Sequence, residues 1–433
     1  MDLAYMAALP PMEFVERRQR LLALMPDNSA LLLFSAEEKI RNRDCEYPFR
    51  QDSYFWYLTG FNEPSAALLL VKQAREGHTS LFLRPRDPEQ ETWTGKRLGV
   101  AAAPKRLFLD SAFKINDLDA VLGKTLENLG AFFYCPQHQI WGNALLSEQI
   151  NIELAQDWQP WLDEMRLIKS NNEIRLMQQA AQISAFGHIR AMQQTYPNRM
   201  EYEIEAELLH EFARFGARFA AYNSIVASGE NACILHYTEN DQVLRDGDLL
   251  LIDAGCEFAM YAGDITRTFP INGCFSAPQR EIYELVLQAQ KQAIALLTVG
   301  TTLGEVEQEV IRIITAGLLT LGILQGELNQ LIEQKAYRAF YMHGLGHWLG
   351  LDVHDVGNYG ENKNRPLQEG MVLTVEPGIY ISPEAAVPVQ YKGIGVRIED
   401  NILITEYGNK ILTAAAPKEI IEIENLMNSH KRS

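Results

Sequence analysis

The sequence predicts a two-domain protein of the mixed α/β (α+β) class. Its 433 residues exceed the length that a single hydrophobic core usually serves, so two domains are expected. In the first part of the chain, apolar runs typical of strands alternate with helix-like stretches, which indicates a small α/β domain. The second part opens with amphipathic helices and then becomes rich in strands, with helices between them. We place residues 1–165 in the first domain and residues 166–433 in the second.

The elements of the first domain follow from the spacing of its apolar residues. Residues 14–25 carry apolar side chains at helical intervals among Arg and Glu, which predicts an amphipathic helix. Three runs rich in Leu, Ala and Phe then predict strands, at Ala30–Phe34, Ala66–Val71 and Ser80–Arg84.

The second domain is expected to begin with a capped helix. Ser170 and Glu173 have the spacing of a capping box, and apolar residues recur at helical intervals as far as Met192. A second helix is predicted to begin near Met200, and a later one to cover Arg280–Leu297.

Composition excludes several classes of protein. The chain is 47% apolar and 22% charged, as ordinary globular proteins are, and its formal charge of -17 argues against a nucleic-acid-binding surface. The start, MDLAYMAALPPMEF, lacks the basic region of a secretion signal, and the apolar runs are too short to span a bilayer. We expect a soluble, cytoplasmic protein without membrane contact, whose five dispersed cysteines are reduced thiols.

Two aspartates in the second domain are predicted to face each other on a hairpin. DLLLIDAG has the pattern of a buried strand that ends at Asp253, and GDITRTF alternates from Asp264. A hairpin that turns near Phe258 and Ala259 would place the two side chains opposite each other, with Cβ atoms about 5 Å apart. Two such carboxylates repel unless a cation lies between them. The alternative is that Asp253 caps a turn and Asp264 pairs with Arg267.

A glycine-rich segment, HGLGHWLGLDVHD, concentrates His343, His347 and His354, three of the nine histidines of the chain. It is not the helical H-E-x-x-H zinc motif, because the Glu is missing and its glycines would weaken a helix. A lone histidine is more often a hydrogen-bonded core residue than a ligand, but this concentration favours a site.

Two glutamates end or follow predicted strands. MVLTVEPG places Glu376 at the end of an alternating run that Pro and Gly terminate, and GVRIED places Arg397 and Glu399 on one face. Glu399 could form an ordinary ion pair with Arg397, or Arg397 could hold a metal-binding Glu399 in orientation.

Together these residues form a ligand set of carboxylates and one imidazole without thiolates. Such a set suits Mn²⁺, Co²⁺, Fe²⁺ or Zn²⁺, and carboxylates that bridge two ions about 3.5–4 Å apart make a hydrolytic site. The residue chemistry therefore predicts a metallohydrolase with two metal ions, held by Asp253, Asp264, His347, Glu376 and Glu399.

The sequence segments around these residues resemble those of a known family. CILHYTEN, LIDAGCE, YAGDITRTFP, HGLGHWLGLDVHDVG, VLTVEPGIYI, YKGIGVRIEDNI and the N-terminal EYPFRQDSYFWYLTGFNEP are similar to motifs of the pita-bread metallopeptidases, which include methionine aminopeptidase, prolidase and creatinase. The nearest resemblance is to the bacterial aminopeptidase P (Xaa-Pro aminopeptidase) family, over nearly the whole chain. It implies an N-terminal aminopeptidase P domain and a C-terminal pita-bread domain with a curved, mostly antiparallel sheet.

The resemblance also implies a mechanism. The chain would cleave the bond between an N-terminal residue and a following proline by means of a hydroxide that bridges two divalent ions, most often Mn²⁺. Asp264 and Glu399 would bridge both ions, Asp253 would complete one site, and His347 with Glu376 the other. Glu376 would also carry a proton from the bridging water to the proline nitrogen.

Further residues match supporting positions of the family. His236 and His354 would stabilise the tetrahedral intermediate, and His343 would line the proline pocket. Tyr380 and Arg397 match two supporting residues of the strands. Asp44 matches a first-domain acid near the amino end of the substrate, and Trp93 matches a tryptophan that a neighbouring subunit contributes to the site. Tyr380 could instead be a packed strand aromatic and Asp44 a solvated loop acid. A family arginine expected shortly before the domain boundary has no counterpart in NIELAQDWQPWLDEM.

Three functions are compared. The leading one is an Xaa-Pro aminopeptidase that acts on peptides with proline at the second position, as a homotetramer or homodimer. A prolidase, which cleaves Xaa-Pro dipeptides, would need the same ligands. A non-catalytic peptide-binding module on the same fold is disfavoured by the complete ligand set.

Overall fold

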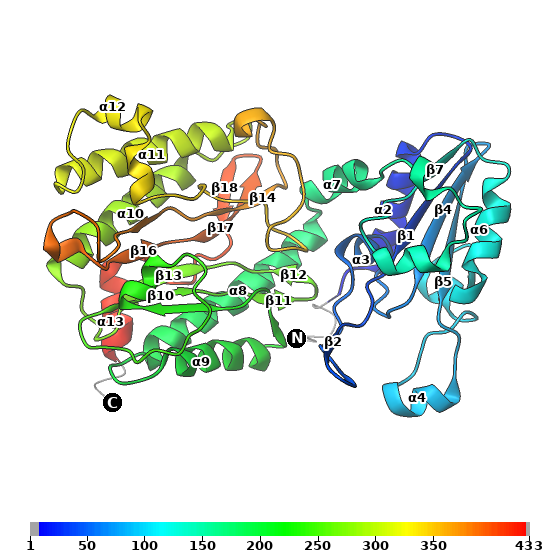
Figure 1. The fold of residues 1–433 in the computed structure, drawn as a ribbon, viewed down its shortest axis with the longest axis horizontal. Helices are drawn as coiled ribbons and strands as arrows, with labels where there is room; N and C mark the ends of the chain where they lie inside the picture. The colour runs from blue at the N-terminus through cyan, green and yellow to red at the C-terminus, as the bar shows by residue number, and fades with distance from the viewer. Residues whose placement is uncertain (1–7, 430–433) are drawn as a thin grey trace. The chain divides into compact units, whose positions relative to one another are not determined.

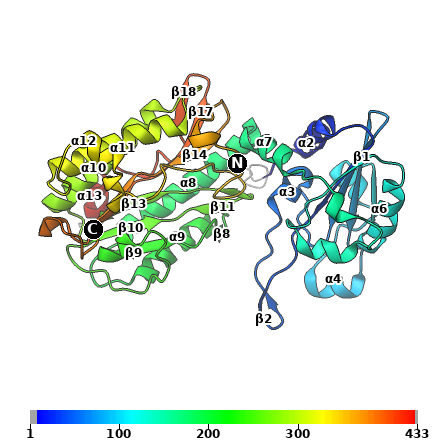
Figure 2. The same cartoon turned by 45° about the horizontal axis from the view of Figure 1, so that its top comes forward.

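The computed structural model describes residues 8–429, which divide into two compact units. One unit comprises residues 9–165, and the other comprises residues 166–429 together with Ala8. Figures 1 and 2 show both units as ribbons, and each is described by itself.

The first unit contains a five-stranded mixed sheet in the order β6-β5-β4-β1-β7. The central strands β1, β4 and β5 pair antiparallel, while the outer strands β6 and β7 pair parallel with β5 and β1. The strands of this unit are β1 (Ser29–Phe34), β2 (Ile40–Asn42), β3 (Cys45–Glu46), β4 (Ala67–Gln73), β5 (Glu76–Leu83), β6 (Ser111–Lys114) and β7 (Ala131–Phe133). The three strands and the N-terminal helix predicted from apolar spacing are confirmed, in β1, β4, β5 and α2 (Pro11–Leu24).

Helices surround this sheet and close its core. β1 is buried along its whole length, as its uninterrupted apolar sequence requires, and Leu32 and Phe34 pack with Leu118 and Leu122 of α6. The helices of the unit after α2 are α3 (Ser53–Thr59), α4 (Pro88–Thr94), α5 (Ala103–Leu107), α6 (Leu118–Leu126) and α7 (Gln159–Leu167), the last of which contains the boundary.

In the second unit, every paired strand runs antiparallel to its neighbours, as predicted. The strands form four short sheets, in the orders β13-β10-β9, β12-β11-β8, β14-β17-β18 and β15-β16. Their bounds are β8 (Phe219–Ala220), β9 (Ile225–Ser228), β10 (Leu249–Asp253), β11 (Cys256–Phe258), β12 (Tyr261–Ala262), β13 (Thr266–Pro270), β14 (Val372–Val375), β15 (Gly378–Tyr380), β16 (Gly395–Arg397), β17 (Asp400–Thr405) and β18 (Gly408–Ile411).

Helices pack on the strands of this unit. α8 and α9 contact the strands β8, β9, β11 and β12, while α10 contacts β14, β15 and β16. Figure 1 shows α8 beside β11 and β12. The predicted capping box is present at Ser170 and Glu173, which begin α8. The helices are α8 (Asn171–Gln194), α9 (Glu201–Arg214), α10 (Ala277–Leu296), α11 (Leu303–Thr320), α12 (Leu328–Glu333) and α13 (Ile420–Ser429).

The predicted register of the aspartate hairpin is wrong by two residues. Asp253 lies opposite Thr266, and the turn consists of Ala259 and Met260, both with positive φ (51° and 76°). A two-residue turn of this kind normally contains Gly or Asn, and because neither residue is present here, the position of the turn could not be recognised from the sequence. Asp264 is therefore a diagonal neighbour of Asp253, on the same face but one pair further toward the turn.

No helix between residues 8 and 429 is long and apolar enough to cross a membrane.

The packing of α8 against α9 generates a stability prediction. A Cβ atom added at Gly187 of α8 would lie 2.5 Å from the ring of Phe212, which is buried in α9. Gly187→Ala should therefore lower the free energy of unfolding by about 1–3 kcal/mol, because a filled core position must be forced apart. Gly123 of α6 has open space around it, so Gly123→Ala should instead stabilise by about 0.5–1 kcal/mol.

Scanning calorimetry of both variants beside the wild type measures these opposite shifts. A Gly187→Ala protein as stable as the wild type would contradict the close α8–α9 contact.

Candidate active site

One cavity of about 750 Å³ in the second unit collects most of the residues singled out by the sequence. The four candidate carboxylates come from strand ends or from the short segments between consecutive strands, and His347 comes from the irregular segment before β14. Asp253 ends β10, Glu376 follows β14, and Asp264 and Glu399 lie between neighbouring strands. Besides these carboxylates, the cavity is lined by His236, His343, His347, His354 and Arg397.

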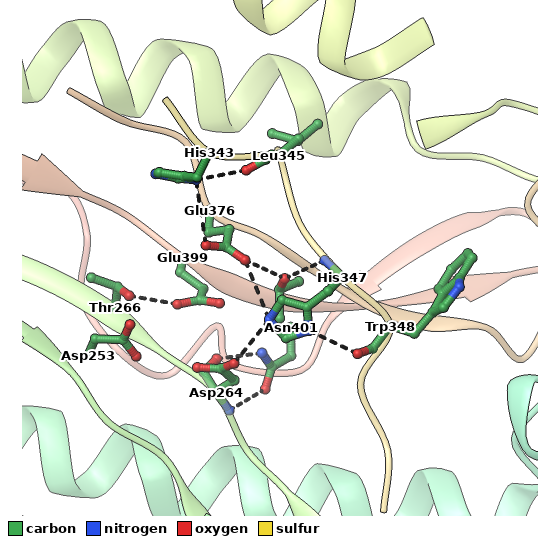
Figure 3. A network of polar contacts seen from close by, with 12 residues as sticks. Asp253, Asp264, Thr266, His343, Leu345, His347, Trp348, Glu376, Glu399 and Asn401 are labelled. Carbon is green, nitrogen blue, oxygen red and sulfur yellow. Dashed lines mark hydrogen bonds and ion pairs between the residues drawn. The ribbon is translucent and has the colours of Figure 1, made fainter. Parts of the chain in front are cut away.

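The ligand atoms of three candidates converge closely. One ligand atom each from Asp264, His347 and Glu399 lie within 4.8 Å of one another. His347 Nε2 is 3.4 Å from an oxygen of Asp264 and 3.5 Å from an oxygen of Glu376, as Figure 3 shows. These separations are longer than good hydrogen bonds, but they leave the side chains pointing at a common centre.

Burial perturbs the carboxylates of this group strongly. It raises the pKa of Asp264, raises the pKa of Glu376 from 4.5 to about 7, and raises the pKa of Glu399 well above its ordinary value. Burial alone would lower the pKa of His347, but the carboxylates of Asp264 and Glu376 raise it to about 9. Negative charge at this centre therefore lacks sufficient compensation from protein cations.

Asp253 has two polar partners, one of which the sequence analysis missed. Arg397 donates a hydrogen bond of 2.7 Å to one oxygen of Asp253. The hydroxyl of Tyr222 lies 2.6 Å from the other oxygen and 2.5 Å from an oxygen of Asp264. Because a phenol has a single proton, it can donate to only one of the two carboxylates. Tyr222 follows no strand pattern in the sequence, so nothing marked it in advance.

This arrangement fits divalent cations. Four carboxylates and one imidazole face a common space, Arg397 compensates the charge of Asp253, and burial raises the pKa of the other three acids. Hard cations with oxygen and imidazole ligands would neutralise this excess negative charge.

A directional chain of hydrogen bonds runs beside the carboxylates. Arg397 donates to the hydroxyl of Tyr380 at 2.9 Å, and that hydroxyl lies 2.8 Å from His343 Nε2. His343 Nδ1 lies 2.8 Å from the carbonyl oxygen of Gly344. Since Arg397 can only donate and the carbonyl can only accept, Tyr380 donates to Nε2 and the proton of His343 resides on Nδ1. Burial also lowers the pKa of His343 to about 4, so this ring is neutral at pH 7.

The other histidines lie around the carboxylates. His354 packs edge-on against His347, with ring centroids 4.3 Å apart. Burial, and after it the charge of His347, lowers the pKa of His354. His236 lines the same cavity.

Asp44 and Trp93 belong to the first unit. Asp44 lies in the exposed turn between β2 and β3, and Trp93 of α4 is 84% exposed. Their local surroundings give neither residue a role of its own.

Comparisons with known proteins agree with this site. The family model described as Metallopeptidase family M24 matches residues 175–406, and that of the Aminopeptidase P, N-terminal domain, matches residues 14–133. The Xaa-Pro aminopeptidase of Haemophilus influenzae is 68% identical over 99% of this chain and 100% of the relative. The Xaa-Pro aminopeptidase of Escherichia coli is 49% identical over 98% of this chain and 99% of the relative.

Solved structures of relatives share the fold of the whole chain. Zinc-substituted E. coli aminopeptidase P in complex with product matches with a TM-score of 0.94 and 49% identity, over 98% of this chain and 99% of that one. Proline aminopeptidase P II from Yersinia pestis matches with a TM-score of 0.94 and 50% identity, over 97% and 100%.

The fold and the site thus define a metallo-exopeptidase with an aminopeptidase P N-terminal domain and a C-terminal pita-bread domain, as the sequence predicted. Within that class, the chain belongs to the Xaa-Pro aminopeptidases of metallopeptidase family M24.

The raised pKa values generate a prediction about the metal-free protein. Folding raises the pKa of Glu376 from 4.5 to about 7 and that of His347 from 6.5 to about 9, so the folded state binds more protons than the unfolded state. The extra protons stabilise the folded state fully below the unfolded pKa values of 4.5 for Glu376 and 6.5 for His347. This stabilisation is lost as the pH rises through the folded pKa values of about 7 and about 9. Burial lowers the pKa of His188 and His343 from 6.5 to about 4, which acts in the opposite direction below about pH 6.5. The melting temperature of chelator-treated protein should therefore fall between about pH 6.5 and about pH 9.

Calorimetry with and without Mn²⁺ measures this effect, and bound cations should remove most of the fall. In Glu376→Gln the part of the fall below pH 7 should be shallower. If the melting temperatures of metal-free wild type and metal-free Glu376→Gln depended on pH in the same way, the raised pKa assigned to Glu376 would be wrong.

Proposed function

We propose that the chain removes the N-terminal residue from peptides that have proline at the second position. The observation that carries this proposal is the convergence of four carboxylates and four histidines on one cavity, in a chain 68% identical to an Xaa-Pro aminopeptidase. We also propose residues 1–165 and 166–433 as the two functional domains, close to the compact units described above.

In this proposal Asp264 and Glu399 hold both of two divalent cations, Asp253 completes one site, and His347 with Glu376 completes the other. The proximity of the ligand atoms of Asp264, His347 and Glu399 supports this division. We propose Mn²⁺ as the native ion, because the donor set consists of hard oxygens and one imidazole; Co²⁺, Zn²⁺ or Fe²⁺ would suit the same ligands. When bound, such cations lower the pKa of water and polarise the carbonyl of the scissile bond.

Glu376 is proposed to move the proton of the reaction. Its carboxylate faces the cavity, with one oxygen 3.5 Å from His347 Nε2, where it could accept a proton from water and return it to a leaving nitrogen. Thr374 donates a hydrogen bond of 3.0 Å to one oxygen of Glu376, which leaves the other oxygen available for this transfer.

The histidines and their partners are proposed to bind the substrate around the reacting bond. His236 and His354 would hold the scissile carbonyl and stabilise the negative charge that develops on its oxygen. His343, which is neutral, would line the proline pocket, with Tyr380 and Arg397 fixing its orientation. Arg397 would additionally hold Asp253.

A comparison of peptide lengths tests the substrate. Purified protein with Mn²⁺ should release the first residue from X-Pro-Y tripeptides and should prefer them to X-Pro dipeptides. A marked preference for the dipeptide would favour the prolidase alternative, and tripeptides left intact with every divalent cation would contradict both enzymes. Elemental analysis that finds no transition metal would favour the peptide-binding module.

Glu376→Gln should keep the fold and lower kcat by about 10²–10⁴-fold, because the amide cannot carry the proton. The exposed Glu406 provides a matched control, since Glu406→Gln makes the same chemical change outside the cavity and should leave turnover unchanged. Circular dichroism verifies the fold of both variants. A Glu376→Gln enzyme with most of its rate would refute the assigned role.

We also propose a cytoplasmic homotetramer or homodimer in which Trp93 of one subunit reaches the site of another, and Asp44 interacts with the amino end of the substrate. The side chain of Trp93 is 84% exposed and is therefore accessible to a neighbouring subunit. Light scattering should give a mass above one chain. Trp93→Ala should lower kcat/KM without loss of metal, and unchanged kinetics would contradict the role.

A further inference from the structure

Asp264 lies between two short strands, since β12 ends at Ala262 and β13 begins at Thr266. On one edge the main chain stays paired here, because Gly263 N–H donates to the carbonyl of Cys256 at 2.9 Å and Ala254 N–H donates to the carbonyl of Ile265 at 3.0 Å. The two segments approach very closely, because a Cβ atom at Gly255 would lie 1.7 Å from the carbonyl oxygen of Gly263. The peptide groups of adjacent residues in a strand point to opposite edges, so the N–H and carbonyl of Asp264 itself need hydrogen-bond partners on the other edge.

The side chain of Asn401 provides these partners. The main-chain N–H of Asp264 donates to Asn401 Oδ1 at 3.1 Å, and Asn401 Nδ2 donates to the main-chain carbonyl of Asp264. One side-chain amide thus makes the donor–acceptor pair that a peptide group of an adjacent strand would make. Figure 3 shows both contacts beneath the carboxylate of Asp264.

Asn401 is itself held rigidly. It belongs to β17, is 1% exposed, and its main-chain N–H donates to the hydroxyl of Thr413 at 3.1 Å. Its direct cross-strand partner on β14 is Thr374, and opposed residues of an antiparallel pair point to the same face.

Thr374 holds two further candidate ligands from that position. Its hydroxyl accepts a hydrogen bond of 3.0 Å from the main-chain N–H of His347 and donates one of 3.0 Å to the carboxylate of Glu376. Its main-chain N–H donates to the carbonyl of His347 at 2.9 Å. One cross-strand pair therefore contacts three ligands that lie far apart in the sequence.

We propose that Asn401 and Thr374 are positioning residues of the metal site, which hold Asp264, His347 and Glu376 in place before cations bind. The inference deepens the proposed function, because it rests on these three residues being ligands. The three residues come from separate segments of the chain, and oxygens of Asp264 and Glu376 lie 3.4 and 3.5 Å from His347 Nε2 without direct hydrogen bonds, so the site needs fixed supports while it is empty. Loss of the support should weaken cation binding even when the fold persists.

The chain offers a matched control for each residue. Asn409 of β18 donates through Nδ2 to the carbonyls of Ile294 and Leu297, so Asn409→Ala also removes an asparagine that bonds main chain. Thr315 is fully buried like Thr374 and donates to the carbonyl of Ile311, so Thr315→Val also removes a buried hydroxyl. Neither control residue lines the cavity.

The test is a calorimetric titration of full-length, chelator-treated protein with Mn²⁺. Asn401→Ala and Thr374→Val should bind Mn²⁺ about 10- to 100-fold more weakly than the wild type, as is typical for residues that support metal ligands. Thr374→Ser keeps the hydroxyl and should bind like the wild type. Asn409→Ala and Thr315→Val should lose thermal stability but keep wild-type affinity, which separates positioning from general stability.

Each outcome decides the proposal. Folded Asn401→Ala and Thr374→Val proteins that bind Mn²⁺ like the wild type, or weaken no more than the controls, would overturn it while leaving the proposed function intact. If Asn401→Ala does not fold, the nearly isosteric Thr374→Val and its serine rescue decide the result. Wild-type protein that binds no Mn²⁺ would overturn the proposed function and this inference together.

Discussion

The burial of four carboxylates around one imidazole is the constraint on which the rest of the second unit depends. Removing charge from water is costly, and here Arg397 compensates only Asp253 directly. Glu376 and Glu399 respond with raised pKa values, so the metal-free fold keeps protons where it would otherwise keep negative charge. The same excess of oxygen ligands makes the cavity suitable for divalent cations, so the chemistry of the family and the instability of the empty site have a single origin.

The ligands lie where regular structure stops. A strand interior pairs its peptide groups with neighbours and points alternate side chains to opposite faces, so it cannot aim several acids at one point. The candidate carboxylates therefore occupy strand ends and the short segments between strands, where polar side chains hold them. Thr266 at the start of β13 is one such side chain, since its hydroxyl donates to Glu399 and accepts from Arg397. The antiparallel strands thus bring distant segments together, and polar side chains between them set the final positions.

The sequence singled out the four carboxylates that the structure gathers in one cavity, because acids at the ends of apolar runs are conspicuous, and it predicted the helices from capping and apolar spacing. It placed the aspartate hairpin two residues out of register, because the turn at Ala259 and Met260 uses positive φ without glycine or asparagine. It missed Tyr222 and Asn401 because their partners are far away in the chain. Residues two positions apart in a strand point to the same face. This rule could have identified Thr266 and Thr374 from the sequence, because each lies two residues from a predicted ligand. Asp44 and Trp93 have no local pattern that distinguishes a role from simple exposure.

The hydrogen-bond chain from Arg397 through Tyr380 to His343 has a consequence for proton leakage. His343 Nδ1 lies 3.9 Å from an oxygen of Glu376, so His343 is the member of this chain that a proton on that carboxylate would reach first. This route is closed, because Nδ1 already carries a proton, Nε2 is occupied by the hydroxyl of Tyr380, and Arg397 at the far end can only donate. A proton on Glu376 is therefore not passed on through His343, Tyr380 and Arg397.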